Sequence, residues 1–484
     1  MKRCPPAAAL GFLLLPVCST LAAAPINLSK HRSFADDITE TLYALPNEVS
    51  SSLGISMALG LIYPGCTGES VTQLEETLGF PPSDSSHLPW KDTSDQLSGA
   101  DGSCQGEIYD GRCYREAPTL KIANSVWFHT ANALDPEYRD TVGPDIVREI
   151  DFASAASPAL VNDWVKNQTN GLINSIVSQD RPLYPPHELI AVNTIYFKAA
   201  WVKPFMDHST NLDKFYSSVT RSKEASRAYF MHTVSEFPYS HTIMPGYQVV
   251  RLPFANSQIS FVVVLPMNDD SSETPVKSSS LLPLLSNMDS TRVALGLPKF
   301  KFGSEYSDRL KDAIKQTGIV APFSGGSLCR LFRDDDTCQA LFITEIIQKT
   351  VIDVNEKGVE AAAATAVMVG RTALPTHETE PVLMLCDHPF QFFIYHESEE
   401  LVLFEGRVGM PELPDAVDQE PRLKSKHNDE DFWERFGVEP ISPRFEAEDS
   451  SGSSPTLRKF LFCKKGLVPI AAAFLAALIL HFIL

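Results

Sequence analysis

The sequence is short of positive charge. Its 41 lysine and arginine residues stand against 60 aspartate and glutamate residues, which gives a formal net charge of −19. Binding to nucleic acid or to a generic anionic surface needs clustered lysine and arginine, so this balance argues against both kinds of partner. For the same reason, activation by a heparin-like polyanion is not indicated, and we expect no cofactor.

The sequence also lacks the common catalytic signatures. It contains no Gly-x-Ser-x-Gly elbow, no His-Glu-x-x-His pair, no phosphate loop and no dinucleotide fingerprint. A hydrolase, metalloenzyme or nucleotide-dependent enzyme is therefore disfavoured. Asp387 and His388 are adjacent, and neighbouring positions on a strand face opposite sides, so we expect a structural role and no relay between them.

The overall amino-acid composition is typical of a folded protein. Hydrophobic residues make up 44% and charged residues 21% of the sequence, which is close to the usual globular mixture and sufficient for a large core. A length of 484 residues alone would permit two or three domains.

A proline-free run of small residues extends from Glu356 to Leu374, and Pro375 follows it. Gly358 supplies flexibility at its start, and the absence of proline permits a central strand. A period-2 pattern would bury one face without a charge, the face of Val359, Ala361, Ala363, Thr365, Val367 and Val369. The alanines alone would equally suit a surface helix. The strand formers Thr365, Val367 and Val369 favour the strand.

This run resembles the reactive-centre hinge of the serpins, and further resemblances follow in that family's order over about residues 30–414. They include Asn47–Phe80, Asn124–Trp127, Val161–Gly171, Val192–Phe205, Leu297–Phe302, Ile352–Thr365, Asp387–Phe390 and Leu403–Val408. The resemblance implies an α+β serpin fold with three β-sheets, about nine helices and an exposed loop able to insert into the main sheet. It also implies one domain over residues 25–414, with the reactive-centre loop at about 356–375.

The resemblance implies a mechanism as well. A serine protease cuts the loop and forms an acyl-enzyme, and the upstream arm then inserts into the main sheet and traps it. Arg371 is expected on the acyl side of the cut and Thr372 beyond it, which predicts a trypsin-like target; the commonest hinge length would instead place Thr372 on the acyl side. The hinge residues are Glu356, Gly358, Val359, Glu360, Ala361, Ala362, Ala363, Ala364 and Thr365.

The region that gates sheet opening in serpins departs from the family pattern here. The residues expected to form it are Ser51, Gly54, Ser56, Asn193 and Gln348. Gln348 stands where histidine is common, so some hydrolysis of the loop as an ordinary substrate is expected. The alternatives are a non-inhibitory serpin that acts as a carrier, chaperone or adhesion protein, and a surface interaction protein that acts through its acidic stalk.

The cysteines divide into groups. Cys104 with Cys113, and Cys329 with Cys338, lie in polar insertions and are candidate disulfides; zinc binding is the alternative, although no Cys-x-x-Cys spacing or nearby histidine supports it. Cys66 and Cys386 are expected to be buried thiols. Asn27 and Asn167 begin glycosylation sequons.

The sequences at both ends of the chain predict where in or on the cell the protein is located. Residues 1–24 have the basic start, apolar stretch and small residues of a signal peptide. Residues 415–455 resemble an acidic, flexible stalk. Residues 456–484 form a hydrophobic anchor or a GPI-attachment signal, and the positive charges that precede the apolar run favour the second. We therefore expect a secreted or cell-surface monomer associated with a membrane through its C-terminus.

Overall fold

A computed structural model describes residues 26–413, except 83–87, 99–107, 110–111, 114–117, 131–133, 180–182, 184–188, 256, 270–273, 333–340 and 360–379. All described residues belong to one compact unit, Met1–Glu439. The predicted signal peptide, stalk and C-terminal anchor lie outside the described residues. Within the described part of the chain, no helix combines the length and apolar character needed to cross a bilayer.

Eight α-helices occur among the described residues, and two of them show why they begin where they do. The side chain of Asn27 accepts hydrogen bonds from the first amides of α1, and that of Ser51 accepts from Gly54 N in α2. The helices are α1 (Leu28–Leu42), α2 (Ser52–Ile62), α3 (Glu69–Leu78), α4 (Lys91–Ser98), α5 (Pro136–Val142), α6 (Ser157–Gln168), α8 (Ser278–Leu281) and α9 (Asp308–Gln316).

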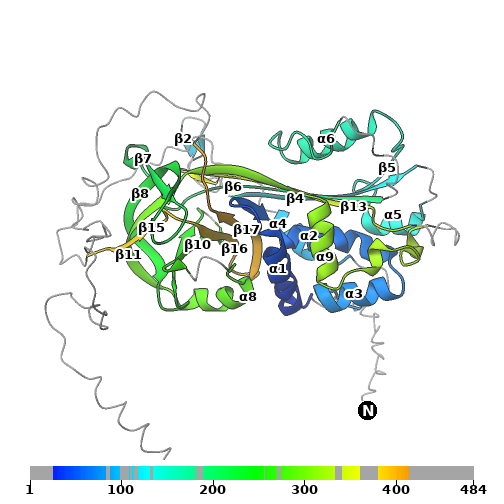
Figure 1. The fold of residues 1–484 in the computed structure, drawn as a ribbon. Helices are drawn as coiled ribbons and strands as arrows, with labels where there is room; N and C mark the ends of the chain where they lie inside the picture. The colour runs from blue at the N-terminus through cyan, green and yellow to red at the C-terminus, as the bar shows by residue number, and fades with distance from the viewer. Residues whose placement is uncertain are drawn as a thin grey trace, which may run out of the picture. The chain divides into compact units, whose positions relative to one another are not determined.

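A six-stranded sheet runs through the middle of the unit (Figure 1). Its order is β12 (Phe300–Tyr306), β13 (Glu345–Asn355), β14 (Gly358–Val359), β6 (Leu189–Ala200), β4 (Thr119–His129) and β5 (Val147–Ile150). Figure 1 shows α6 on one face of this sheet and α1, α2 and α9 on the other. Since both faces are covered, β6 is almost wholly buried, and its sequence is accordingly apolar along most of its length.

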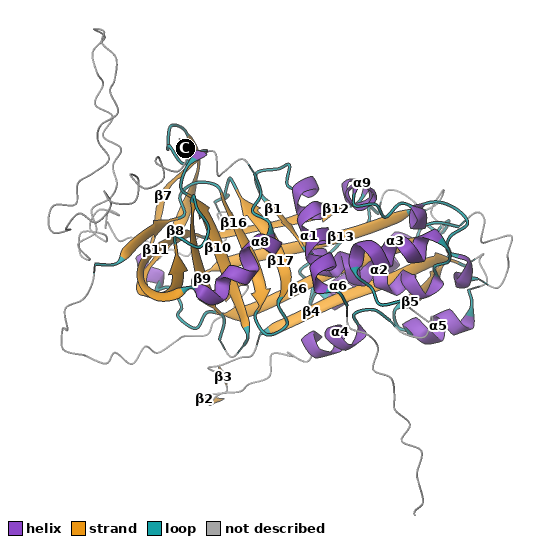
Figure 2. Cartoon of the chain, turned by 90° about the horizontal axis from the view of Figure 1, so that it is seen from below, coloured by secondary structure: helices purple, strands orange, loops and turns teal. Residues whose placement is uncertain are grey.

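A second sheet has nine strands, and Figure 2 shows several of them side by side. Its path is β1 (Glu48–Ser50), β17 (Leu401–Val408), β16 (Phe390–His396), β10 (Ile259–Pro266), β9 (Tyr247–Pro253), β8 (Glu224–Ser240), β11 (Asp289–Pro298) and β15 (Val382–Leu385), with β7 (Thr210–Tyr216) paired to β8. The long β8 pairs with β7 early, with β11 later and with β9 at its end, and so joins the two halves of this sheet. A small hairpin of β2 (Ile108–Tyr109) and β3 (Arg112–Cys113) stands apart.

The largest apolar cluster fills the space between the two sheets and the helices α1 and α2. A smaller cluster joins α6 to the opposite face of the six-stranded sheet through Val161, Val165, Ile190, Val192 and Ile347. The two clusters contact alternate residues of β6, as the period of a strand requires. The predicted α+β class is confirmed.

Candidate functional site

The first hinge residues already lie inside the six-stranded sheet. Gly358 and Val359 form β14, which pairs antiparallel with β13 through Val354 and with β6 through Ala199 and Ala200. A short strand thus separates one end of β13 from one end of β6. The next residues of the loop, 360–379, lie outside the described residues.

Beyond β14 the same two strands contact each other directly. Residues Glu345–Thr350 of β13 pair in parallel with Ile190–Ile195 of β6, and Gln348 faces Asn193 in this register. We call the line between β13 and β6 the central seam. Along this seam, β14 separates the two strands at one end, and the strands pair directly with each other over the rest.

Backbone and side-chain contacts fix the start of the hinge. The carboxylate of Glu356 accepts a hydrogen bond from Thr210 Oγ1 at 2.8 Å and pairs with Lys299 Nζ at 2.9 Å. The Glu356 carbonyl accepts from Phe205 N at 2.9 Å, and the Lys357 carbonyl accepts from Trp201 N at 2.9 Å. These contacts anchor the chain at the position from which any strand extension would begin.

The two β14 residues suit their place for different reasons. A Cβ atom on Gly358 would lie 1.9 Å from the carbonyl oxygen of Ala199, so close approach to β6 requires glycine. Val359 is 2% exposed and belongs to the main apolar cluster. The alternation predicted from sequence placed Val359 on the face that can be buried, and its burial agrees with that assignment.

Four of the five residues predicted to gate sheet opening meet at the central seam. Gln348 Oε1 accepts from Ser51 N at 3.0 Å, while Gln348 Nε2 donates to Ser51 O at 2.9 Å and to Asn193 Oδ1 at 2.7 Å. A Cβ atom on Gly54 would lie 2.6 Å from Asn193 Oδ1, so only glycine lets α2 approach that carboxamide. Ser51, Asn193 and Gln348 are fully buried. The fifth residue, Ser56, accepts a hydrogen bond from Trp90 Nε1 and contacts none of the other four through its hydroxyl.

The structure adds Asn124, Ser52 and Glu405 to this cluster, none of which was among the residues predicted to gate sheet opening. Asn193 Nδ2 donates to Asn124 Oδ1 at 2.7 Å, which extends the network to β4. Ser52, next to the capping Ser51, donates to the carboxylate of Glu405 on β17. Glu405 is 1% exposed. The sequence could have indicated Glu405, because it is a single acidic residue in an otherwise largely apolar strand. No local sequence pattern indicates that Asn124 contacts Asn193.

Burial raises the pKa of Glu405 to about 7. The hydrogen bond from Ser52 favours the ionised form and opposes this shift, while the charge of Asp36 adds to it. Glu405 is thus a buried carboxyl that changes charge near neutral pH, one hydrogen bond away from the start of α2.

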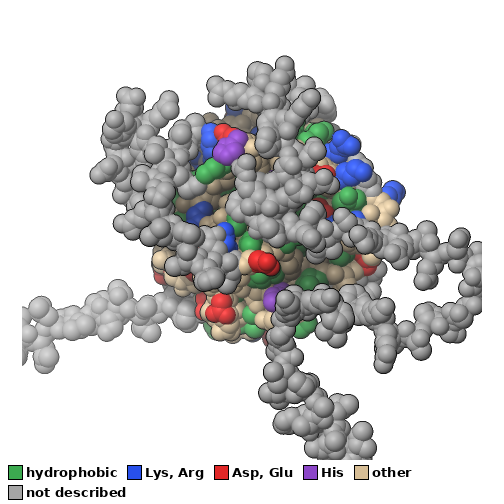
Figure 3. All heavy atoms as spheres, turned by 90° about the vertical axis from the view of Figure 1, so that its left-hand side faces the viewer, with side chains coloured by type: hydrophobic (Ala, Val, Ile, Leu, Met, Phe, Trp, Pro, Cys, Tyr) green, Lys and Arg blue, Asp and Glu red, His purple; other side chains and the backbone are tan. Residues whose placement is uncertain are grey.

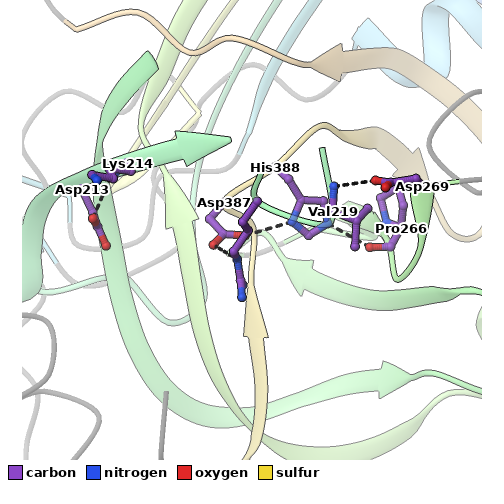
Figure 4. Close-up of polar contacts among 8 residues, drawn as sticks. Asp213, Lys214, Val219, Pro266, Asp269, Asp387 and His388 are labelled. Carbon is purple, nitrogen blue, oxygen red and sulfur yellow. Dashed lines mark hydrogen bonds and ion pairs between the residues drawn. The ribbon is translucent and has the colours of Figure 1, made fainter. Parts of the chain in front are cut away.

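The argument that the side chains of Asp387 and His388 face opposite sides of a strand was wrong. Both lie in the loop before β16, where the alternation of a strand does not apply, and His388 Nδ1 lies 2.9 Å from Asp387 Oδ1. Asp387 Oδ2 also pairs with Arg221 Nε at 2.7 Å, and His388 Nε2 lies 2.9 Å from the carbonyl of Pro266 (Figure 4). These contacts hold the turn between β7 and β8 against the loop before β16, so the predicted structural role agrees with them.

Other predicted sites fall partly or wholly outside the described residues. Glu360, Ala361, Ala362, Ala363, Ala364, Thr365, Arg371, Thr372, Cys104 and Cys338 are among these, and the side chain of Cys113 is likewise outside them. Both proposed disulfides therefore stay predictions. Cys66 and Cys386 are confirmed as buried free thiols. Asn27 and Asn167 lie on the surface, where a glycan can be attached.

The side of the molecule that carries β7, β11 and β15 faces the viewer in Figure 3. Both basic and acidic side chains are visible on the described part of this surface. Residue 380, where the described chain resumes after the loop, leads directly into β15. The described chain therefore resumes on this side of the molecule.

Residues 29–411 match the sequence model of the serpin family, the serine protease inhibitors. The chain belongs to the serpin family. An uncharacterised serpin-like protein of Thermococcus kodakarensis is 30% identical over 387 residues, which cover 78% of this chain and 84% of that protein.

Solved serpin structures agree on the fold. A highly specific serpin of the insect Tenebrio molitor superposes with a TM-score of 0.60 at 24% identity, over 78% of this chain and 96% of that one. Human thyroxine-binding globulin, solved with thyroxine, gives a TM-score of 0.63 at 22% identity, over 79% of this chain and 98% of that one. Serpins are not enzymes, and serine proteases are the targets of the inhibitory members. The family also has non-inhibitory members, so membership alone does not decide what this serpin does.

Proposed function

We propose that this serpin inhibits a trypsin-like serine protease by covalent trapping, with Arg371 on the acyl side of the cut and residues 360–369 inserting along the central seam. The observation that carries the proposal is the position of β14, which already separates β13 from β6 at the end where insertion would start. Strand addition to a sheet is a known way for such a loop to act.

If the pairing of β14 continues along both neighbouring strands, it predicts where each inserted residue would lie. Each step beyond Val359 moves one residue back along β6 and one back along β13, because β14 is antiparallel to both. Thr365 would then lie between Asn193 and Gln348, and Met368 between Ile190 and Glu345, the last pair of the seam. Arg371 would lie beyond the seam, roughly 40 Å from its start at about 3.3 Å per residue.

The residues that would flank the inserted segment 360–369 match it in size and polarity. Positions that continue the alternation of Val359 would contact Phe197, Ile195, Ala191 and Leu189, all in the main apolar cluster. Small residues at 361 and 363 fit beside these large ones. Ala366 and Met368 on the opposite face would meet Val192, Ile190 and Ile347, the cluster beneath α6.

The test is a titration with trypsin. A complex that survives hot detergent should form near equimolar ratio, with a fraction of the serpin cleaved without complex formation because the gating residues depart from the family pattern. Mass spectrometry of the released C-terminal fragment should show Thr372 as its first residue. Absence of a detergent-stable complex would reject trapping, and a fragment that begins at Ala373 would move the acyl position to Thr372.

We further propose that the protein enters the secretory pathway through residues 1–24 and is held at the cell surface through residues 456–484. Glycans at Asn27 and Asn167 and the disulfides Cys104–Cys113 and Cys329–Cys338 accompany that route. Release of the protein from cells by a phosphatidylinositol-specific phospholipase would support a GPI anchor, whereas retention would support a spanning tail.

A further inference from the structure

The first turn of α2 contacts both strands of the central seam and one strand of the other sheet. The backbone N–H and carbonyl of Ser51 bond the side chain of Gln348 on β13. Gly54 packs closely against β6. Between them, the hydroxyl of Ser52 donates to the carboxylate of Glu405 on β17. A change at Glu405 is therefore transmitted to the closed seam through one turn of helix.

Glu405 is surrounded by polar and acidic groups. It lies on β17 opposite Ser50 of β1 and Phe393 of β16, neither of which titrates. On α1, Thr39 offers a hydroxyl, and the charge of Asp36 has the same sign as that of Glu405. The helix α2 contains no ionisable residue. Among the described residues, no lysine, arginine or histidine forms an ion pair with Glu405.

The other ionisable groups near Glu405 do not neutralise it either. Burial raises the pKa of Tyr43 and of Tyr306 on β12, and the charge of Glu405 adds to both shifts, so the two phenols stay neutral near pH 7. Glu48 of β1 is paired with Arg309 of α9 at 2.9 Å, so that guanidinium already has a carboxylate partner. Ionised Glu405 is thus a buried charge held only by hydroxyl and amide donors, which is a costly arrangement.

We propose that the protonation state of Glu405 controls how often the central seam opens. With the carboxyl neutral, the first turn of α2 packs against β17 and holds β13 beside β6. With the carboxyl ionised, an opening that admits water to Glu405 is favoured, because the charge is then solvated.

Burial raises the pKa of Glu405 to about 7, so the change in opening falls near neutral pH. The inference deepens the proposed function and rests on it, because insertion of the loop requires an open seam. The opening itself can be measured without any protease.

Hydrogen exchange of the full chain, followed by mass spectrometry between pH 5.5 and 8, tests this control. After correction for the intrinsic pH dependence of exchange, the amides of residues 345–350 and 190–195 should open about three- to thirtyfold more often at the higher pH. They should also exchange faster than the buried amides of β10, which report global unfolding. Seam amides that match those of β10 at both pH values, or that open equally often at both, would overturn the proposal.

Two variants assign the effect to a residue. Glu405→Gln keeps an acceptor for Ser52 and removes the titration, so its seam amides should open equally often across this pH range. Glu397→Gln, at a more exposed acid that pairs with Arg251, should keep the wild-type dependence. The same dependence in all three proteins would reject the role of Glu405. A trypsin titration that yields no stable complex would reject trapping, whereas the exchange measurement decides the control by Glu405 separately.

Discussion

At the scale of single residues, the central seam is held by buried amides and not by charges. Gln348 binds both backbone groups of Ser51 and the carboxamide of Asn193, and Asn193 in turn binds Asn124. In the proposed inserted register Thr365 would come between Gln348 and Asn193, so this bond exists only while the seam is closed. The Gln348–Asn193 bond therefore stabilises only the intact form, whereas the bonds of Gln348 to Ser51 do not depend on the closed seam.

Replacement of Gln348 by alanine tests this difference. Gln348→Ala leaves Ser51 N, Ser51 O and Asn193 Oδ1 without their buried partner, which should destabilise the intact protein by about 2–4 kcal/mol. The loop-cleaved form should lose less, because the Gln348–Asn193 bond is already broken there. Thermal midpoints of intact and nicked protein, each compared with wild type, give the two losses. Equal losses in both forms would contradict this account of the seam.

Glu405 predicts a dependence on pH. Its pKa in the folded protein is about 7, against an ordinary value of 4.5, because the carboxyl is buried. The folded state binds this proton more tightly than the unfolded state, so the stabilisation is complete below pH 4.5 and is lost as the pH rises through 7. At about 1.36 kcal/mol per pKa unit, the loss is about 3 kcal/mol.

The variant Glu405→Gln isolates this contribution. Wild type should lose stability relative to the variant between pH 4.5 and 7.5, as measured by thermal midpoints over that range. His31, whose pKa burial lowers to about 4, titrates identically in both proteins and cancels in the comparison. Glu397→Gln, at a more exposed acid, is the control. If the plots of thermal midpoint against pH for wild type and Glu405→Gln run parallel, Glu405 does not cause the pH dependence.

At the scale of secondary-structure elements, the arm after Val359 should tolerate charge on one face only. Ala361 would lie beside Phe197 in the main apolar cluster, so Ala361→Glu buries an unpaired charge and should block insertion. The variant should be cut by trypsin as a substrate, with the stoichiometry of inhibition raised at least severalfold. Ala373→Glu, beyond the cut, controls for charge on the loop. A normal stoichiometry in Ala361→Glu would show that the register continued from β14 is wrong.

The elements also show what a sequence can and cannot predict. The burial of Val359 follows from local alternation, and the meeting of Ser51, Gly54, Asn193 and Gln348 follows from the family resemblance. Asn124 and Glu405 were missed because their partners lie far away in the chain, at Asn193 and Ser52. The pairing of Asp387 with His388 was missed because a rule for strands was applied to a loop. Local periodicity predicts faces, but it does not predict which distant side chains meet.

At the scale of the whole molecule, the proposed insertion requires that the described fold, with its closed seam, is not the most stable arrangement available to a cut chain. Insertion would separate the direct pairs between Glu345–Thr350 and Ile190–Ile195 and replace them with pairs on both sides of a new strand. A dozen or more added hydrogen bonds at about 1 kcal/mol each, together with burial of Val367 and Val369, would release roughly 10–20 kcal/mol. The intact protein would then persist because the seam opens slowly, as in other kinetically stable proteins.

Cleavage of the loop by catalytic trypsin tests this directly. The nicked protein should unfold at a thermal midpoint tens of degrees above that of the intact protein, because the inserted arm adds a central strand to the six-stranded sheet. Nicked Ala361→Glu should show little or no gain, since its arm cannot enter, and it serves as the matched control that has the same cut. If nicked wild type unfolds at the same midpoint as the intact protein, then β14 is a fixed end of the sheet and not the start of an inserting strand, and the loop would serve only as a surface for binding.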